Sequence, residues 1–150
     1  MNISHSTEVL EAAKIINYEL VPLSIEKSKK VLQIVLERFC HKKRYSFPLW
    51  EDIIDRESIR YKFAWDLFNQ IFDKESVVLF FDHGDDENMF LFDDGGVLTK
   101  IFENCYKFAF YITKLNNDFL IAFNDHDYLI GAGTGKLIVN NIAMGKYNPH

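Results

Sequence analysis

Residues 107–133 read KFAFYITKLNNDFLIAFNDHDYLIGAG, and this stretch decides the fold. It contains three short apolar runs, KFAFYIT, FLIAF and YLIGAG, which are rich in the β-branched and aromatic residues typical of strands. The polar sequences KLNND and NDHD separate these runs, and Asn and Asp are common turn residues. The stretch therefore predicts three consecutive strands joined by tight turns, so that neighbouring strands are antiparallel.

Two more strands and a helix are predicted just before this stretch. SVVLFF (76–81) and MFLF (89–92) have the composition of strands. Residues 96–105 return to helical spacing. Their apolar positions are Val97, Leu98, Ile101, Phe102 and Cys105. A helix between two strands suits a crossover connection, so we expect the strands at 89–92 and 107–113 to be parallel.

The first half of the chain is predicted to be helical. Helices are expected at residues 7–20, 25–40, 48–54 and 57–72. Pro22 ends the first helix and Ser24 can cap the second. The tail after Gly135 is expected to form a last short helix that ends at Gly145. This order predicts a single α+β domain, in which helices pack on one face of a mostly antiparallel sheet of about five strands with one inserted helix.

The composition indicates a folded cytoplasmic protein. Hydrophobic residues make up 48% of the 150 residues and aromatic residues 15%, which is enough for a sizeable core. No apolar run reaches the roughly 18 residues of a membrane span. The N-terminus lacks the basic and apolar regions of a secretory signal. Cys40 and Cys105 have no CxxC partner and are expected to be reduced. We therefore expect no membrane contact.

Charge is distributed unevenly along the chain, whose net charge is −5. Residues 26–62 carry ten Lys or Arg against six Asp or Glu, whereas residues 63–127 carry four Lys against thirteen Asp or Glu. The acidic part would repel nucleic acid phosphates and attract a basic protein. We interpret the basic run HKKR at 41–44 as a solvated loop near a helix C-terminus. We therefore expect a protein partner and no nucleic acid.

The sequence GAGTGK at 131–136 resembles a phosphate-binding loop but lacks its essential positions. A P-loop needs glycine at position 130 and Ser or Thr after the lysine, where this chain has Ile130 and Leu137. A dinucleotide site needs a further helix and strand, and only fifteen residues remain after Gly135. The glycines are instead expected to bend the strand or to let another backbone approach closely.

Two turns rich in Asp and His follow apolar strands, DHGDDE at 82–87 and NDHD at 124–127. If the helix at 96–105 makes a crossover, both turns lie at the same end of the sheet. Their side chains could then hold a divalent metal or act as acid and base. The candidates are His83, Asp85, Asp86, His126 and Asp127. The spacing matches no local ligand pattern and no nucleophile signature is present. We therefore expect no enzyme and no cofactor, with a small metal-dependent enzyme as the alternative.

An acidic surface is the other interpretation of these turns. Six acids and no Lys or Arg occur between residues 82 and 94. They are Asp82, Asp85, Asp86, Glu87, Asp93 and Asp94, and the crossover would add Asp125 and Asp127. Phe90, within the same stretch, would supply a buried aromatic anchor for a basic partner. The competing interpretation is a solvated acidic edge that prevents the short strand at 89–92 from pairing with other chains.

A compact acidic α+β domain of this size resembles the immunity proteins of bacterial polymorphic toxin and contact-dependent growth inhibition systems. The sequence AFNDHDYLIGAGTG at 122–135 is also similar to the endings of small bacterial domains found with such systems. The resemblance implies a cytosolic protein that binds one toxin domain, often a nuclease, and blocks its active site. A regulatory or ligand-binding module without chemistry of its own remains a further possibility. The oligomeric state stays open.

Overall fold

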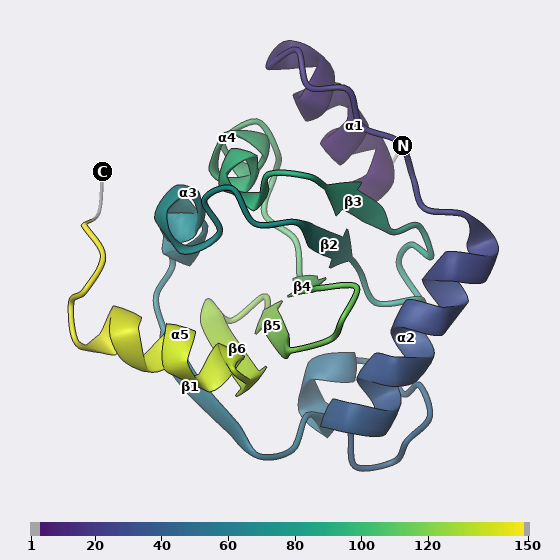
Figure 1. Cartoon of the computed structure of the whole chain (residues 1–150), viewed down its shortest axis with the longest axis vertical. Helices are drawn as coiled ribbons and strands as arrows, with labels where there is room; N and C mark the ends of the chain where they lie inside the picture. The colour runs from purple at the N-terminus through teal and green to yellow at the C-terminus, as the bar shows by residue number, and fades with distance from the viewer. Residues whose placement is uncertain (1–3, 149–150) are drawn as a thin grey trace.

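The computed structural model describes residues 4–148 and contains one six-stranded sheet (Figure 1). In spatial order the strands are β1 (Arg56–Arg60), β6 (Tyr128–Gly133), β5 (Phe119–Phe123), β4 (Phe110–Thr113), β2 (Val77–Phe80) and β3 (Phe90–Phe92). The α-helices are α1 (His5–Ile15), α2 (Ile25–Phe39), α3 (Phe68–Ile71), α4 (Leu98–Glu103) and α5 (Gly135–Ala143). Three 3₁₀ helices are η1 (Leu49–Asp52), η2 (Ala64–Leu67) and η3 (Gly95–Val97). The α+β class is confirmed, with six strands instead of about five.

Every pair of neighbouring strands in the sheet is antiparallel. β2 lies between β3 and β4, so these two strands are parallel to each other and α4 connects them as a crossover. The predicted crossover is therefore confirmed. Because β5 is antiparallel to β4, it runs in the same direction as β2. The turns that follow β2 and β5 consequently lie at the same end of the sheet.

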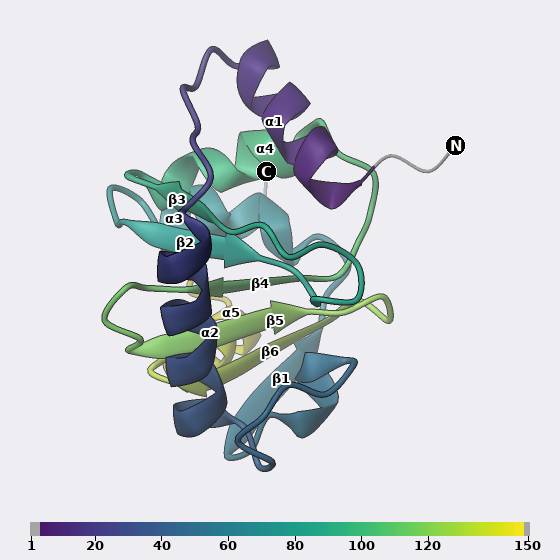
Figure 2. The same cartoon turned by 90° about the vertical axis from the view of Figure 1, so that its right-hand side faces the viewer.

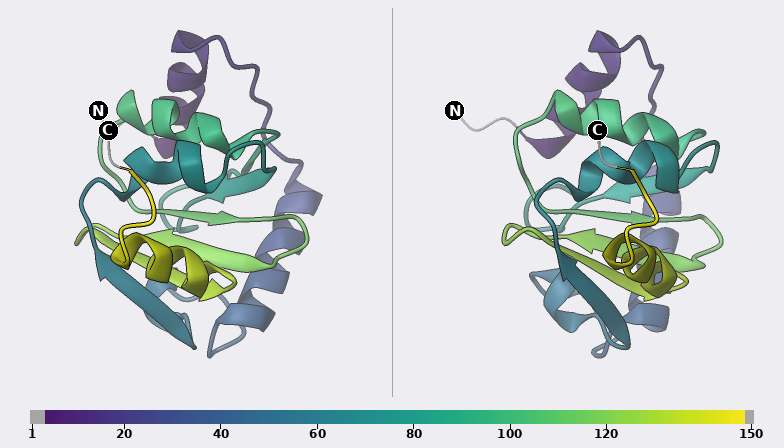
Figure 3. Two further views of the ribbon diagram at one scale, coloured as in Figure 1. Left: turned by 60° about the vertical axis from the view of Figure 1, so that its left-hand side comes forward. Right: turned by 90° about the vertical axis from the view of Figure 1, so that its left-hand side faces the viewer.

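Helices cover both faces of the sheet (Figures 2 and 3). α2 lies on one face, where Val31 and Val35 join a core with Val78 and Leu120. The other four α-helices contribute to a second core on the opposite face. The expectation that helices pack on one face is therefore wrong. The physical reason is that β2, β4 and β5 are buried at every residue, so neither of their faces can be left to water.

The predicted helix at 57–72 is also wrong at its start. Residues Arg56–Arg60 form the edge strand β1, which pairs along β6. Helical structure begins only with η2 and α3. The apparent helical stripe combined Ile59 from the strand with Phe63 and Leu67 from the segment after it. β1 is mostly exposed, so it lacks the apolar run by which the other strands were recognised.

The remaining helices differ from the prediction mainly in their ends. α1 stops at Ile15 instead of residue 20, because Asn17 takes a left-handed conformation with φ of 57°. Ser24 caps α2 as expected, accepting a hydrogen bond from the amide of Lys27. Gly145 follows α5 with φ of 70°. Within residues 4–148, no helix has the length and apolar character needed to cross a membrane.

The glycines of GAGTGK serve close packing between β6 and α5. A Cβ at Gly131 would lie 2.2 Å from the carbonyl oxygen of Gly135, at the start of α5. Gly133 has φ of 61°, and a Cβ there would lie 2.5 Å from the carbonyl oxygen of Asp118. Lys136 pairs with Asp55 at 3.1 Å. The expectation of a close backbone approach is confirmed, and α5 lies against β6 for this reason (Figure 3).

Replacing Gly131 by Ala should destabilise the fold by about 1–3 kcal/mol or more, because the new methyl group meets backbone that cannot rotate away. The urea midpoint of Gly131→Ala should therefore fall clearly below that of the wild type. Gly84→Ala is the matched control, because its Cβ would lie 3.4 Å from Phe47, an ordinary contact. Equal midpoints for the two variants would contradict this account of the β6–α5 contact.

Candidate functional site

The turns after β2 and β5 line a hollow at one end of the sheet. The hollow has a volume of about 410 Å³ and is also lined by the start of α1 and by residues before and within η1. Its lining residues are His5, Phe47, Pro48, Trp50, Asp82, Asp85, Lys107, Phe108, Ala109, Asp125 and His126. We call it the sheet-end hollow. The prediction that the two polar turns lie at the same end is thereby confirmed.

Asp82 lines the hollow but is only 2% exposed. Its carboxylate accepts hydrogen bonds from the Tyr111 hydroxyl at 2.7 Å, the Leu49 amide at 2.8 Å and the Tyr45 hydroxyl at 3.0 Å. Burial, followed by the negative charge of Asp82, raises the pKa of Tyr45 to about 12 and also raises that of Tyr111. Asp82 was expected to bind a partner, but it is buried and binds this chain instead.

Asp86 also binds other residues of this chain. Its carboxylate accepts hydrogen bonds from the Ser6 amide at 2.9 Å and from the backbone and side-chain nitrogens of Asn88. Ser6 lies in the first turn of α1, where a carboxylate also interacts favourably with the helix dipole. Burial raises the pKa of Asp86, but the hydrogen bonds from Ser6 and Asn88 outweigh it and hold the pKa below its ordinary value. The expected surface acid is therefore a cap of α1.

Three other acids from these turns are exposed, and each has histidine as its ionic partner within residues 4–148. Asp85 lies 3.8 Å from His5, Glu87 lies 3.9 Å from His83, and Asp125 lies 3.7 Å from His126. Lysine or arginine would hold a fixed positive charge beside each carboxylate, and none of the three has such a partner in this part of the chain. These three acids are the part of the predicted acidic surface that faces solvent at this end of the sheet. We call them the sheet-end carboxylates.

Asp127 differs from the sheet-end carboxylates because cations surround it. It forms an ion pair with Lys107, which also lines the sheet-end hollow. The hydrogen bond from Lys107, with the further charges of Lys62 and Arg60, holds the pKa of Asp127 below its ordinary value. Its φ of 67° ends the turn that begins at Asn124. Its charge is neutralised within the chain.

The other predicted surface residues lie elsewhere. Phe90 is completely buried in the core, so it cannot be a docking anchor. Asp93 and Asp94 follow β3, which is antiparallel to β2, and so they lie at the opposite end of the sheet. Asp94 caps η3 and accepts hydrogen bonds from the amides of Lys74 and Gly96. The acidic segment 82–94 is thus divided between two ends of the molecule.

The structure does not gather the proposed metal ligands. Among the described residues, no group of three or more His, Cys, Asp or Glu side chains is placed to hold a metal ion. His126 lines the sheet-end hollow, whereas His83 packs against Tyr45 outside it. The alternative of an Asp/His metal centre therefore lacks its ligand set. Burial raises the pKa of both Cys40 and Cys105 to about 12, so neither thiol is ionised at neutral pH.

Several residues of the hollow escaped the sequence prediction. His5 stacks on Phe108 with ring centroids 4.4 Å apart, although the two residues are far apart in the chain. Phe47 is 63% exposed beside the 82–87 turn. Trp50 lies edge-on to His126 at 6.2 Å. A usable signal existed only for Phe47 and Trp50, because FPLW places two large aromatic residues around a proline.

Residues 4–143 match a family of unknown function, DUF6756. The chain belongs to this family. No curated protein and no solved structure matches the chain. The family spans the sheet, all five α-helices and the sheet-end hollow, so the fold described above is that of the DUF6756 domain in this chain.

The cap formed by Asp86 predicts a pH-dependent stability. Because its pKa is lowered in the folded state, the ionised carboxylate stabilises the fold above about pH 4, and this contribution is lost as the pH falls through the folded pKa. Asp86→Asn should therefore be less stable than the wild type between about pH 5 and 7 and approach it below about pH 4. Urea unfolding over this pH range measures the difference.

Asp93→Asn is the control for this experiment, because Asp93 is exposed and lies at the other end of the sheet. Its stability should differ little from that of the wild type at every pH. A difference between Asp86→Asn and the wild type that stays constant from about pH 3 to 7 would contradict the assigned role of the charge.

Proposed function

We propose that this chain is a non-catalytic binding protein that neutralises a basic protein domain of the toxin class, as immunity proteins do. The sheet-end carboxylates Asp85, Glu87 and Asp125 are the observation that carries the proposal. They come from two turns that are distant in sequence but lie at one end of the sheet. In this proposal, the chain binds over the active surface of its partner and blocks it sterically and electrostatically, with no chemical step.

Charge complementarity favours a basic partner. None of the three sheet-end carboxylates has a Lys or Arg partner within residues 4–148, so their negative potential is directed to solvent. A partner that brings Arg or Lys would complete these pairs. Such pairs also accelerate encounter between oppositely charged proteins. The one nearby lysine of the hollow, Lys107, is already paired with Asp127.

An exposed aromatic side chain supplies the apolar part of the surface. Phe47 packs over Gly84 in the 82–87 turn, where a Cβ on the glycine would lie 3.4 Å from its ring. The backbone that carries Phe47 is fixed, because Asp82 accepts a hydrogen bond from the amide of Leu49, two residues further along the chain. A fixed aromatic residue next to exposed carboxylates is the combination typical of binding hot spots. Phe47 thus takes the role that was expected for Phe90.

The competing role of the acids, protection of a sheet edge, has less support. β3 is the edge strand next to the 82–87 turn, and the segment before α2 already lies along it. Pro22 forms a bridge with Phe90, and the Leu23 amide donates a hydrogen bond to the Met89 carbonyl at 2.8 Å. Because chain covers this edge, the exposed carboxylates are not needed to block it.

The decisive experiment uses the protein encoded next to this chain in its genome as the binding partner. We expect that protein to arrest growth when expressed alone and the present chain to restore growth. The purified pair should form a complex whose affinity falls as salt rises from about 50 to 300 mM, because screened charges attract less. Asp85→Lys combined with Asp125→Lys should weaken the complex by about 100-fold or more, since each reversal replaces attraction with repulsion.

Asp93→Lys is the matched control for each single reversal, Asp85→Lys or Asp125→Lys, because it makes the same change of charge on an exposed acid at the opposite end of the sheet. Beyond the general effect of the altered net charge, this variant should change the affinity by less than about threefold. Similar losses of affinity from Asp93→Lys and from the reversals at Asp85 and Asp125 would refute the sheet-end surface as the binding site. A neighbouring product that neither arrests growth nor binds would refute the proposed function itself.

A further inference from the structure

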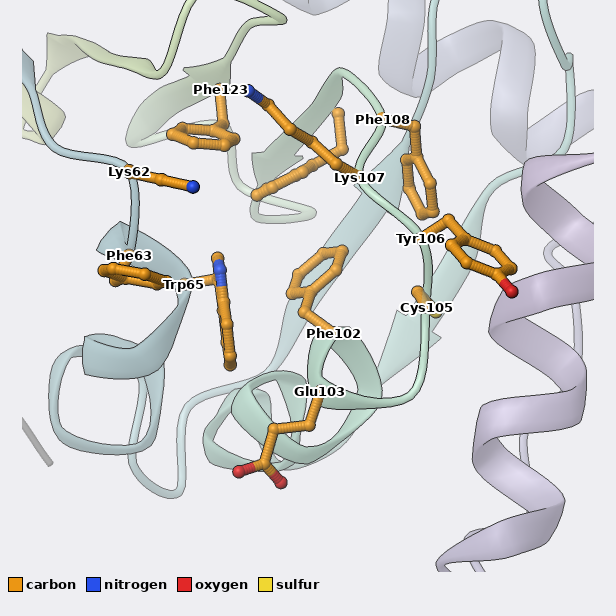
Figure 4. Close-up of a pocket in the computed structure, with 11 residues that line it drawn as sticks. Lys62, Phe63, Trp65, Phe102, Glu103, Cys105, Tyr106, Lys107, Phe108 and Phe123 are labelled. Atoms are coloured by element: carbon orange, nitrogen blue, oxygen red, sulfur yellow. The ribbon is translucent and has the colours of Figure 1, made fainter.

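A second hollow, which shares Lys107 and Phe108 with the sheet-end hollow, is an apolar pocket of about 270 Å³ (Figure 4). Its walls come from the segment that leads into η2, from α4 and the loop after it, and from β4 and β5. Its lining is dominated by seven aromatic side chains, which are Phe63, Trp65, Phe102, Tyr106, Phe108, Phe110 and Phe123. An apolar cavity of about 150 Å³ already accepts a benzene ring, so this pocket has room for one ring and a short substituent.

The rings around the pocket are arranged for contact with another ring. Phe102 and Phe110 stack with centroids 4.2 Å apart, and Phe63 meets Trp65 edge to face at 6.5 Å. These are the two geometries that aromatic rings prefer. Phe63 is 52% exposed, so part of the lining is open to an incoming molecule.

The polar groups at the pocket are mostly hydrogen-bond donors. Figure 4 shows the ammonium group of Lys62 directed into the pocket and the carboxylate of Glu103 directed away from it. Lys107 contributes a second ammonium group, and the indole nitrogen of Trp65 lies on the side of its ring nearer Lys62 in this view. Such a set of groups favours a ligand that brings a negative charge and acceptors.

The two lysines differ in their partners. Lys107 is paired with Asp127, whose lowered pKa reflects Lys107 first and then Lys62 and Arg60. Lys62 forms no ion pair with an acid in the described part of the chain, and its ammonium group lies 5.6 Å from the centroid of the Phe63 ring. Three cations thus act on the single carboxylate of Asp127, and two of them, Lys62 and Lys107, line the pocket. This leaves positive charge for a second anion.

We propose that this pocket binds a small aromatic carboxylate, with its ring among Trp65, Phe102 and Phe123 and its carboxylate at Lys62 and Lys107. Both parts of the ligand are required by the observations. The aromatic walls select a ring over a polar molecule, and the unmatched positive charge selects an acid over a neutral or cationic analogue. The site is separate from the sheet-end carboxylates, so it does not depend on the proposed function.

Phenylacetate, phenylacetamide and phenethylamine are suitable probes, because they share the ring and differ in charge. Of the two tryptophans of the chain, only Trp65 lines this pocket, so Trp50→Phe leaves its fluorescence as the reporter. We expect saturable quenching by phenylacetate and at least about tenfold weaker binding of the amide and the amine. Calorimetry on the wild type repeats the measurement without the Trp50 substitution.

Lys62→Gln tests the source of the preference. It should lower the affinity for phenylacetate by about tenfold, the effect of one charge-assisted hydrogen bond, and leave that for phenylacetamide unchanged. Lys100→Gln is the matched control, because Lys100 lies on α4 but does not line the pocket. Absence of saturable binding up to roughly 10 mM phenylacetate would overturn the proposal. Equal affinities for the acid and the amide, or an unchanged Lys62→Gln variant, would overturn it equally.

Discussion

The buried carboxylate of Asp82 is the contact on which the sheet-end surface depends. A carboxylate removed from water is tolerated only when its oxygens are hydrogen-bonded, and here three donors from two distant segments satisfy it. Tyr111 comes from β4, whereas Tyr45 lies in the loop between α2 and η1 and Leu49 is the first residue of η1. One requirement therefore fixes that loop against the end of β2 and sets Phe47 beside the 82–87 turn.

The central strands could be predicted from sequence because their turns are strongly marked. KLNND and NDHD became the turns after β4 and β5, and the helix between β3 and β4 gave the correct strand directions. β1 could not be recognised in the same way, since it is mostly exposed and is a strand only through its pairing with β6, which lies about 70 residues later in the chain. The second helical layer was missed because a fully apolar strand does not reveal which helix covers which face.

The candidate site was predictable in position and only partly in composition. The crossover argument brought the 82–87 and 124–127 turns together, but sequence gives no indication of which acids in a turn point outward. Asp86 was taken by the first turn of α1, about 80 residues earlier, and Asp127 by Lys107. Such partners are set by tertiary packing. Of the six acids between residues 82 and 94, only Asp85 and Glu87 are therefore exposed in the 82–87 turn. The aromatic pocket had no local signal, because its rings come from several separate segments.

In both turns, one buried residue holds the local structure while other residues are exposed. In each, the first polar residue is buried and holds the backbone: Asp82 through its three donors, and Asn124, which is 3% exposed and accepts from the amides of His126 and Tyr128. Asp85 and Asp125, which come later in these turns, are exposed and have only histidine as an ionic partner among the described residues. Mutations at these outer positions therefore change the charge of the sheet-end surface while the scaffold keeps its shape. Under the proposed function, a lineage that follows a changing partner diversifies at these positions without loss of foldability.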